Sequence, residues 1–324
     1  MSKLRTNGLN AVFLIACMVA MGLVSATASA MPESMPAQEL LKRMAEAGRN
    51  LNYQGTFTYE HGGAMKSFRI THNVSGGKEY ERLEYMNGPQ AEVVRSGNPL
   101  ACERAGDLLL RGAIVESGIG YGNLEKHYQL QIKGADRVAG RSVTELHVIP
   151  KDQMRYGYVL SVDKESSLLL RAMLVATSPK QVVLERFEFV QIEIGDELAE
   201  DQLLSSNDLP EEPGTVPCDE EVQDYQKWRV SWLPEGFVLT AVHEGDLDGA
   251  ETLVFTDGLS FFSIFIDAGE GLKMPSLRAK RGATVAAMAR AKYQSKDFAI
   301  CVVGEIPMAV ATRIARSVQA NTNR

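Results

Sequence analysis

The chain has 324 residues, of which 45% are hydrophobic, and this length is enough for two domains. Its 41 Asp and Glu side chains outnumber its 34 Lys and Arg side chains, so the formal net charge is −7. An acidic chain without a long basic run does not attract the phosphate backbone of DNA or RNA, which excludes a nucleic-acid-binding protein. The same acidic balance fits a partner peptide with basic residues.

The first 30 residues have the layout of a secretory signal peptide. Lys3 and Arg5 form a short basic start, residues 9–24 form an apolar run, and Ala28-Ser29-Ala30 is a small-x-small cleavage site. An uncleaved anchor is the less favoured alternative, because the run is shorter than the roughly 20 residues that a membrane span needs. We expect cleavage before Met31 and export of the mature chain.

A large N-terminal domain is expected over residues 31–207. Ser34 can cap a helix over residues 34–50, Pro36 fits its first turn, and apolar residues recur on one face. After this helix the hydrophobic period changes to two, which predicts strands separated by Gly-rich turns. These strands are expected at 53–60, 65–72, 79–86, 91–95, 108–110, 128–133, 143–150, 156–162, 168–177 and 182–194. Many short strands predict a large antiparallel sheet, curved or partly closed into a barrel.

One of these strands, residues 168–176, is apolar at nearly every position. Such a strand is buried on both faces, and the sequence alone favours ordinary core packing on both of them. The alternative is that one face packs on the helix while the other lines a cavity.

A linker and a smaller C-terminal domain follow. Residues 205–217 contain three prolines and few apolar side chains, so we place the linker at 208–217 and the second domain at 218–320. Strands are expected at 237–243, 251–256, 259–266 and 298–304, and a helix is expected to begin at Pro307. Asp257-Gly258 predicts a two-residue hairpin. Residues 279–292 are ambiguous, because their alanines and basic residues favour a helix.

The sequence shows no constellation of catalytic or metal-binding residues. Its five histidines are scattered, no serine lies in a Gly-x-Ser-x-Gly turn, and no two cysteines form a Cys-x-x-Cys pair. We therefore expect neither an enzyme nor a metal or cofactor site. Three cysteines remain after export, Cys102, Cys218 and Cys301, and a Cys218–Cys301 disulfide is one option. Buried, small apolar roles for Cys102 and Cys301 are the preferred alternative.

An ordered set of short segments resembles the MucB/RseB family over nearly all of the mature chain. The segments are Leu51-Asn52-Tyr53, Asn87-Gly88-Pro89, Glu92-Val93-Val94-Arg95, Arg155-Tyr156-Gly157-Tyr158, Trp232-Leu233-Pro234-Glu235-Gly236-Phe237, Thr256-Asp257-Gly258-Leu259, Phe261-Phe262-Ser263-Ile264-Phe265, Val302-Val303-Gly304-Glu305-Ile306-Pro307 and Ala311-Thr312-Arg313-Ile314-Ala315. The resemblance implies an α+β protein. Its N-terminal domain would be a LolA/LolB-like half-open antiparallel barrel with a covering helix, and its smaller C-terminal domain an antiparallel sheet with a C-terminal helix. The family pattern also implies a strand over residues 279–292.

The resemblance further implies a periplasmic negative regulator of a sigma-E or AlgU-type envelope-stress factor. Such a protein binds the periplasmic segment of an RseA or MucA-type anti-sigma factor, shields it from the site-1 protease, and is released by lipopolysaccharide or another acylated lipid. A homodimer is a further hypothesis. The contact candidates for the anti-sigma factor are Trp232, Phe237, Glu305 and Arg313, and exposed aromatic anchors there compete with an ordinary core role. The candidates for the lining of a lipid groove are Phe57, Tyr59, Phe68, Leu83, Tyr85, Tyr158 and Phe187.

Two other functions remain as alternatives. A periplasmic lipid or lipoprotein carrier of the LolA type needs only the first domain, so the second domain counts against it. A periplasmic hydrolase would require a cluster of perturbed ionisable groups in one cleft.

Overall fold

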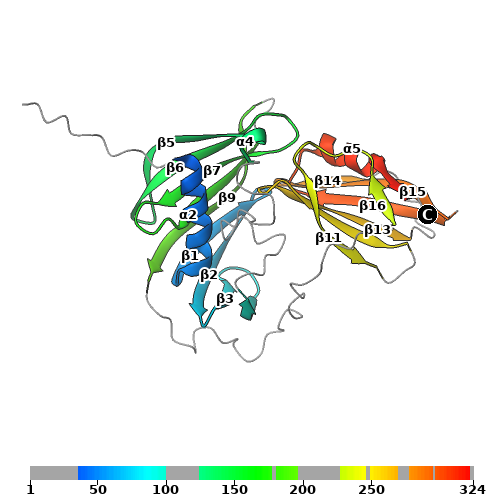
Figure 1. The fold of residues 1–324 in the computed structure, drawn as a ribbon. Coiled ribbons are helices and arrows are strands. Elements are labelled where there is room, and N and C mark those ends of the chain that lie inside the picture. The colour runs from blue at the N-terminus through cyan, green and yellow to red at the C-terminus, as the bar shows by residue number, and fades with distance from the viewer. Residues whose placement is uncertain are drawn as a thin grey trace, which may run out of the picture. The chain divides into compact units, whose positions relative to one another are not determined.

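Two antiparallel sheets, each accompanied by a helix, make up most of the described part of the chain (Figure 1). The computed structural model describes residues 36–99, 124–176, 180–195, 227–245, 249–268, 277–294 and 296–321. The expected signal peptide, cap at Ser34, strand at 108–110 and linker lie outside these residues, as do Cys102 and Cys218. No helix among the described residues is long and apolar enough to cross a membrane.

The first sheet has nine strands in the order β4-β3-β2-β1-β9-β8-β7-β6-β5, and all neighbours are antiparallel. Its strands are β1 (Tyr53–His61), β2 (Ala64–Ser75), β3 (Lys78–Tyr85), β4 (Glu92–Pro99), β5 (Tyr128–Val138), β6 (Arg141–Pro150), β7 (Gly157–Asp163), β8 (Leu169–Ala176) and β9 (Val182–Ile194). The edge strands β4 and β5 do not pair with each other in the described ranges, so the sheet is open, as expected. A short helix, α4 (Leu124–His127), precedes β5.

Helix α2 (Ala37–Asn50) lies across one face of this sheet (Figure 1). Leu40, Leu41 and Met44 recur at helical spacing and are buried, which is the reason this segment folds as a helix on the sheet. The fully buried imidazole of His72 fixes the end of the helix. Its Nδ1 lies 2.8 Å from the carbonyl oxygen of Leu51, and its Nε2 lies 2.8 Å from Glu79 Oε1.

The second sheet has six strands in the order β11-β12-β13-β16-β15-β14. Its strands are β11 (Val238–Glu244), β12 (Glu251–Thr256), β13 (Phe261–Ala268), β14 (Arg278–Arg281), β15 (Thr284–Tyr293) and β16 (Lys296–Gly304). Helix α5 (Met308–Ser317) begins directly after Pro307 and packs on β15 and β16. A two-stranded ribbon of β10 (Trp228–Val230) and β17 (Val318–Ala320) brings both ends of this region together.

The core of this region lies between the six-stranded sheet and α5. Phe262, Ile264 and Ile266 alternate along β13 toward the core, and each is at most 2% exposed. Phe265 points to the opposite face and is 46% exposed. The fully buried indole of Trp228 donates a 2.6 Å hydrogen bond to the carbonyl oxygen of Gly249, so the one polar atom of this large core side chain is satisfied.

The expected strands are observed in the described ranges with small changes at their ends. The prediction of a two-residue hairpin at Asp257-Gly258 is wrong. Strand β12 ends at Thr256, β13 begins at Phe261, and four residues connect them. The carboxylate of Asp257 widens this turn by accepting two backbone N–H bonds inside it. The expected strand over 279–292 is confirmed as extended chain, but a turn at Gly282, whose φ is +59°, divides it into β14 and β15. The sequence reasoning missed the short elements α4, β10 and β17.

The alternation along β13 gives a prediction for stability. Phe262→Ala is expected to lower the free energy of unfolding by about 3–5 kcal/mol, because it removes a fully buried aromatic side chain and leaves a cavity. Urea unfolding followed by circular dichroism measures the loss. Phe265→Ala, on the same strand and exposed, is the matched control and should change stability by roughly 0.5 kcal/mol at most. Equal losses in both variants would contradict the assignment of the core face.

Candidate functional site

The proposed lipid-groove residues lie on the β1, β2, β3, β7 and β9 strands of the nine-stranded sheet. Phe57 pairs with Phe68 across β1 and β2, and its ring centroid lies 4.9 Å from that of Phe187. Phe68 in turn contacts Tyr85, with ring centroids 4.8 Å apart. Phe57, Phe68, Tyr158 and Phe187 are buried, whereas Tyr59, Leu83 and Tyr85 are partly exposed. The four buried side chains are therefore packed as core residues, and lipid entry would require them to move.

Two of these residues, Tyr59 and Tyr158, lie at the contacts with the six-stranded sheet: Tyr158 bonds the turn between β12 and β13, and Tyr59 bonds Glu185, which accepts from Ala283. Residues 36–324 form one contact unit, and two groups of polar contacts connect its sheets. We name them the arginine contact, which comprises Tyr128, Arg155, Tyr158, Asp257 and Ser260, and the glutamate contact, which comprises Tyr59, His61, Glu185 and Ala283.

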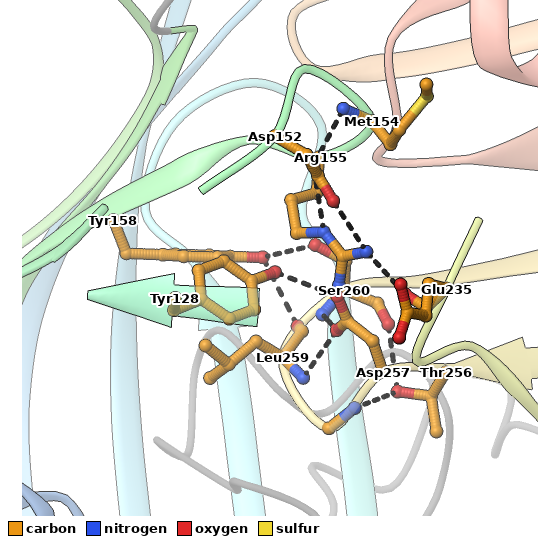
Figure 2. A network of polar contacts seen from close by, with 11 residues as sticks. Tyr128, Asp152, Met154, Arg155, Tyr158, Glu235, Thr256, Asp257, Leu259 and Ser260 are labelled. Atoms are coloured by element: carbon orange, nitrogen blue, oxygen red, sulfur yellow. Dashed lines mark hydrogen bonds and ion pairs between the residues drawn. The ribbon is translucent and has the colours of Figure 1, made fainter. Parts of the chain in front are cut away.

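Arg155 is the centre of the arginine contact (Figure 2). Its guanidinium is completely buried and donates from Nη1 to Asp257 Oδ2 at 2.6 Å and from Nη2 to the carbonyl oxygen of Glu235 at 2.6 Å. Its Nε donates to Asp152 Oδ1 at 3.2 Å, on its own side of the contact. The planar donor fork of arginine suits this site, because the three acceptors lie in different directions around it.

Both carboxylate oxygens of Asp257 accept hydrogen bonds. Its Oδ2 also accepts from the Tyr128 hydroxyl at 2.9 Å, while Oδ1 accepts the backbone N–H groups of Leu259 and Ser260 at 3.0 and 2.8 Å. An aspartate that bonds the backbone two and three residues onward is typical of a turn, so the local sequence holds the carboxylate in place. The hydroxyl of Tyr158 completes the contact by donating to the carbonyl oxygen of Leu259 at 3.2 Å.

Burial and charge together set the protonation of these groups. Burial raises the pKa of Tyr128 and of Tyr158 well above the ordinary value, so both are neutral donors. Burial lowers the pKa of Arg155, but Asp257, Tyr128 and Asp152 together outweigh this effect, and the pKa is raised overall. The pKa of His127 is lowered by burial and by the positive charge of Arg155. The arginine contact therefore holds one buried positive charge against one buried carboxylate.

The glutamate contact joins strands β1 and β9 to the turn between β14 and β15. Glu185 Oε1 accepts the backbone N–H of Ala283 at 2.8 Å and lies 2.8 Å from His61 Nδ1, while Oε2 accepts the hydroxyl of Tyr59. A Cβ atom at Gly282 would lie 2.7 Å from Glu185 Oε1, and the φ of this residue is +59°. Glycine is therefore required at position 282 both by its backbone conformation and by the close approach of Glu185.

Glu305, a candidate for anti-sigma-factor contact, lies near this glutamate contact. Burial and then the negative charge of Glu185 raise the pKa of Glu305 to about 8. Burial, with Glu185 and Glu305 adding to it, also raises the pKa of Tyr156 to about 12. Glu305 is thus mainly protonated at neutral pH, which avoids two adjacent carboxylates in a desolvated place.

The other anti-sigma-factor candidates have different environments. The guanidinium of Arg313 lies over the ring of Trp232, 3.7 Å from its centroid. Arg313 is exposed, and Trp232 is partly buried. Phe237 is only 6% exposed and belongs to the core of the six-stranded sheet, so it has the core role that competed with an exposed anchor in the sequence analysis. Arg155 lies over its ring at 5.3 Å, which explains why Phe237 is held inside.

The sequence reasoning missed Arg155, Asp257 and Glu185 as site residues. Arg155 and Asp257 both lie in segments that carry the family resemblance, yet they are 102 residues apart and nothing in the spacing pairs them. Cys301 is a free thiol that is partly exposed, and burial raises its pKa. The described residues contain no group of three or more His, Cys, Asp or Glu side chains that could hold a metal ion.

The arginine contact gives a prediction for stability. Asp257→Asn is expected to destabilise the protein by about 3 kcal/mol, because it removes the fully buried carboxylate that balances Arg155 and leaves only the partly exposed Asp152 to do so. Urea unfolding measures the loss. Glu39→Gln makes the same chemical change in an exposed ion pair with Arg43 and should cost about 0–1 kcal/mol. A double variant, Arg155→Met with Asp257→Leu, should be less destabilised than Asp257→Asn; a larger loss would argue against a buried charge pair.

Glu305 gives a prediction for pH dependence. Its folded pKa of about 8 lies above the ordinary value of 4.5, so the folded state holds the proton more tightly than the unfolded state. Its stabilising contribution is complete below pH 4.5 and is lost as the pH rises toward 8. Melting temperatures from pH 5 to 9 should fall less in Glu305→Gln than in the wild type. Parallel curves for the two proteins would refute the assignment.

Comparison with known proteins gives matches along the whole described region. The family model of the MucB/RseB N-terminal domain matches residues 36–207, and that of the MucB/RseB C-terminal domain matches residues 222–319. The sigma factor AlgU regulatory protein MucB of Pseudomonas aeruginosa is 34% identical, with 89% of this chain and 92% of the relative covered. The sigma-E factor regulatory protein RseB of Escherichia coli K12 is 26% identical, with 92% and 94% covered.

A solved structure shows the same similarity in three dimensions. The complex structure of Pseudomonas aeruginosa MucA/MucB matches with a TM-score of 0.71 and 31% sequence identity, and covers 89% of this chain and 100% of that chain. Two consecutive family domains and a relative with 34% identity over most of both chains agree with the arrangement of the two sheets. The chain belongs to the MucB/RseB family.

Proposed function

We propose that this protein is a periplasmic regulatory binding protein. It binds the periplasmic segment of a membrane-spanning anti-sigma factor of the MucA or RseA type and so represses a sigma-E-type envelope-stress response. One observation carries this proposal: the chain matches MucB over nearly its full length, and MucB has been solved in a complex with MucA. Export to the periplasm rests on the signal-peptide pattern of the first 30 residues.

The proposed repression is a shielding effect. A protease must take an extended segment of its substrate into its own cleft, and a segment held on the surface of another folded protein is not free to enter. The anti-sigma factor therefore stays intact while it is bound, and the sigma factor stays sequestered. The stacked pair of Trp232 and Arg313 is a candidate anchor, because Trp and Arg dominate the binding energy of many interfaces.

Lipopolysaccharide or another acylated lipid is the proposed releasing signal. Linkage requires that the lipid bind the released form more tightly than the form that holds the anti-sigma factor. The two polar contacts between the sheets supply an element that can exist in a closed and an open arrangement. Because each depends on a few short hydrogen bonds, the loss of one partner changes the balance.

Tyr59 supports a route by which lipid binding could lead to release of the anti-sigma factor. It is one of the candidate groove residues, and its hydroxyl donates to Glu185, the residue that accepts the N–H of Ala283 on the other sheet. Tyr59 is partly exposed, so an acyl chain among the neighbouring aromatic side chains would displace it. Loss of this hydrogen bond would then weaken the glutamate contact.

The proposed role is binding without catalysis. The buried ionisable groups of the arginine contact bond one another, and Asp257 uses both carboxylate oxygens to do so. A homodimer and a LolA-type carrier remain outcomes that the following experiment separates from the regulator.

The test is capture of the periplasmic segment of the MucA-type anti-sigma factor from the same genome by the mature chain, residues 31–324, with and without lipopolysaccharide. The wild type should bind the segment and release it as lipopolysaccharide is added. Tyr59→Phe should still bind, but half-release should need about fivefold less lipopolysaccharide, because a hydrogen bond worth about 1 kcal/mol no longer holds the contact closed.

Tyr80→Phe, which makes the same change on β3 outside the glutamate contact, is the control and should behave as the wild type. Binding that lipopolysaccharide does not affect would retain the regulator and reject the lipid switch. Capture of lipopolysaccharide without any binding of the segment would favour the carrier. Light scattering of the same samples reports whether the chain is a dimer.

A further inference from the structure

The side of the six-stranded sheet that carries α5 exposes five cationic side chains. They are Arg229 on β10, Arg278 and Lys280 on the edge strand β14, and Arg313 and Arg316 on α5. We name this surface the basic face; α5 and β14 are labelled in Figure 1. None of the five takes part in the arginine or glutamate contact, so their role is separate from the joining of the two sheets.

The strand register places the basic residues of β14 on the α5 side of the sheet. Arg278 lies opposite Ala287 of β15, and Lys280 lies opposite Val285. Ala287 and Val285 are buried in the core that α5 covers. Residues that oppose each other on neighbouring strands point to the same side of a sheet, so Arg278 and Lys280 point to the α5 side. They are exposed there because β14 is at the edge of the sheet.

Helix α5 and the two-stranded ribbon continue this surface. Arg313 and Arg316 are three residues apart, about one helical turn, and both are exposed. Arg229 alternates on β10 with Trp228 and Val230, which pack in the core, so its side chain points away from the core. Strand β17, the partner of β10, follows α5 directly along the chain. The five cations therefore come from three elements on one side of the sheet.

No carboxylate of the described residues forms an ion pair with any of these five cations. Arg229 donates to the neutral amide oxygen of Gln319 at 2.9 Å. By contrast, the exposed Arg43 on α2 donates to the carboxylate of Glu39 at 2.9 Å. The positive charge of the basic face is therefore not neutralised by the described part of the chain.

The exposed carboxylates of the six-stranded region do not lie among these cations. Asp267 alternates on β13 with the buried Ile266, and Asp297 alternates on β16 with the buried Phe298. Both therefore point to the face opposite the core and α5. The remaining exposed carboxylates of the described region are Glu235 before β11 and Glu244 at its end, where Lys227 lies 3.9 Å from Glu244; β11 is the edge strand farthest from β14.

The acidic balance of the whole chain is compatible with a basic face, because the acidic residues are concentrated in one segment. Residues 196–226 contain eleven Asp and Glu side chains and no Lys or Arg. The other residues carry all 34 Lys and Arg side chains against 30 of the 41 Asp and Glu side chains. An acidic total can thus coexist with a local surface that attracts anions.

The chemistry of the basic face fits the anionic surface of a lipid bilayer. Helix α5 exposes Ala309, Arg313 and Arg316 but no large apolar side chain, so the face offers charge with little apolar area. Tight protein interfaces depend on buried aromatic or apolar anchors at their centre. Lipid headgroups, in contrast, move laterally and can gather under cations of any spacing, and anionic lipids attract clusters of Lys and Arg in this way.

A purely protective role explains only part of this surface. Basic residues on an edge strand hinder its pairing with the edge of another sheet, and this role suits Arg278 and Lys280. It does not apply to Arg313 and Arg316, because these residues lie on a helix. A surface that attracts an anionic partner accounts for both sets.

We propose that the basic face docks the protein on the anionic surface of a phospholipid membrane. This inference goes beyond the proposed function and needs no partner protein. It would place the chain at the surface where a membrane-spanning anti-sigma factor displays its periplasmic segment. Because the docking is electrostatic, it depends on the anionic lipid content of the membrane and on the salt concentration.

The test is sedimentation of the mature chain, residues 31–324, with vesicles. One set of vesicles contains equal parts of phosphatidylglycerol and phosphatidylcholine, and the other contains phosphatidylcholine alone. The protein should bind the first set and not the second. An increase in salt from about 0.05 M to about 0.5 M screens the charges and should weaken binding to the first set at least about tenfold.

The double variant Arg278→Glu with Lys280→Glu reverses two charges of the basic face on the exposed edge strand. Each Lys or Arg near an anionic membrane strengthens binding about fivefold, so this variant should bind at least about twentyfold more weakly. Lys133→Glu with Lys164→Glu makes the same change in net charge at exposed positions of the N-terminal region and should weaken binding less than about threefold. Circular dichroism checks that both variants fold.

The outcomes separate the membrane from other partners. Binding of the wild type to neither set of vesicles, or equally to both, would overturn the inference. An equal loss in the two double variants would also overturn it, because only the net charge would then matter. If the wild type ignores the vesicles but Arg278→Glu with Lys280→Glu no longer captures the anti-sigma-factor segment, the basic face receives an acidic peptide and not a membrane. The vesicle measurements contain no partner protein, so failure of the proposed function would leave them unchanged.

Discussion

The buried ion pair between Arg155 and Asp257 is the interaction on which the arrangement of the two sheets depends. A buried charge is tolerated only when it is paired and fully hydrogen-bonded, and here each partner comes from a different sheet. Neither side chain can be satisfied alone: Arg155 needs acceptors at Asp257 and Glu235, and Asp257 needs the hydroxyl of Tyr128. The two sheets are therefore joined at this point by a buried ion pair and its hydrogen bonds.

The glutamate contact differs in kind. Its centre, Glu185, bonds a tyrosine, a histidine and a backbone N–H, and Glu305 lies close enough for its pKa to be raised to about 8. The protonation of Glu305 beside this contact can change near neutral pH, whereas the pKa of Arg155 in the arginine contact is raised above its ordinary value. With one firm and one adjustable contact, the angle between the two sheets could change while the sheets stay joined. A binding protein that must release its partner needs such a change.

The residues proposed for lipid binding and for partner binding include some that lie close together, at the contacts between the two sheets. Tyr59 and Tyr158 were considered as groove residues and Glu305 as a partner residue, yet all three lie at or beside the contacts between the sheets. The aromatic side chains behind them are packed as core, so the lipid hypothesis implies a rearrangement and not the filling of an open groove.

Local patterns in the sequence determined much of the fold. The period-two alternation predicted the strands that flank α2 and the linker, and the spacing of Leu40, Leu41 and Met44 predicted the helix, because these patterns depend only on which face of an element is buried. The family resemblance supplied the strand at 279–292, which its alanines and basic residues disfavour. The turn at Asp257-Gly258 was recognised, but its length was not, because the aspartate side chain closes a wider loop.

Only the tertiary structure decided which residues form the contacts between the sheets. Arg155 and Asp257 look like ordinary charged residues in their own segments, and Glu185 is one carboxylate among 41 acidic side chains. Their roles arise from burial and from partners about 100 residues away, which no local pattern encodes. In the same way, alternation alone cannot show that Phe237 is a core residue. The sequence by itself determined most of the elements and the family, because these depend on local patterns, whereas the polar contacts between the two sheets, which form only in the folded chain, determined the site.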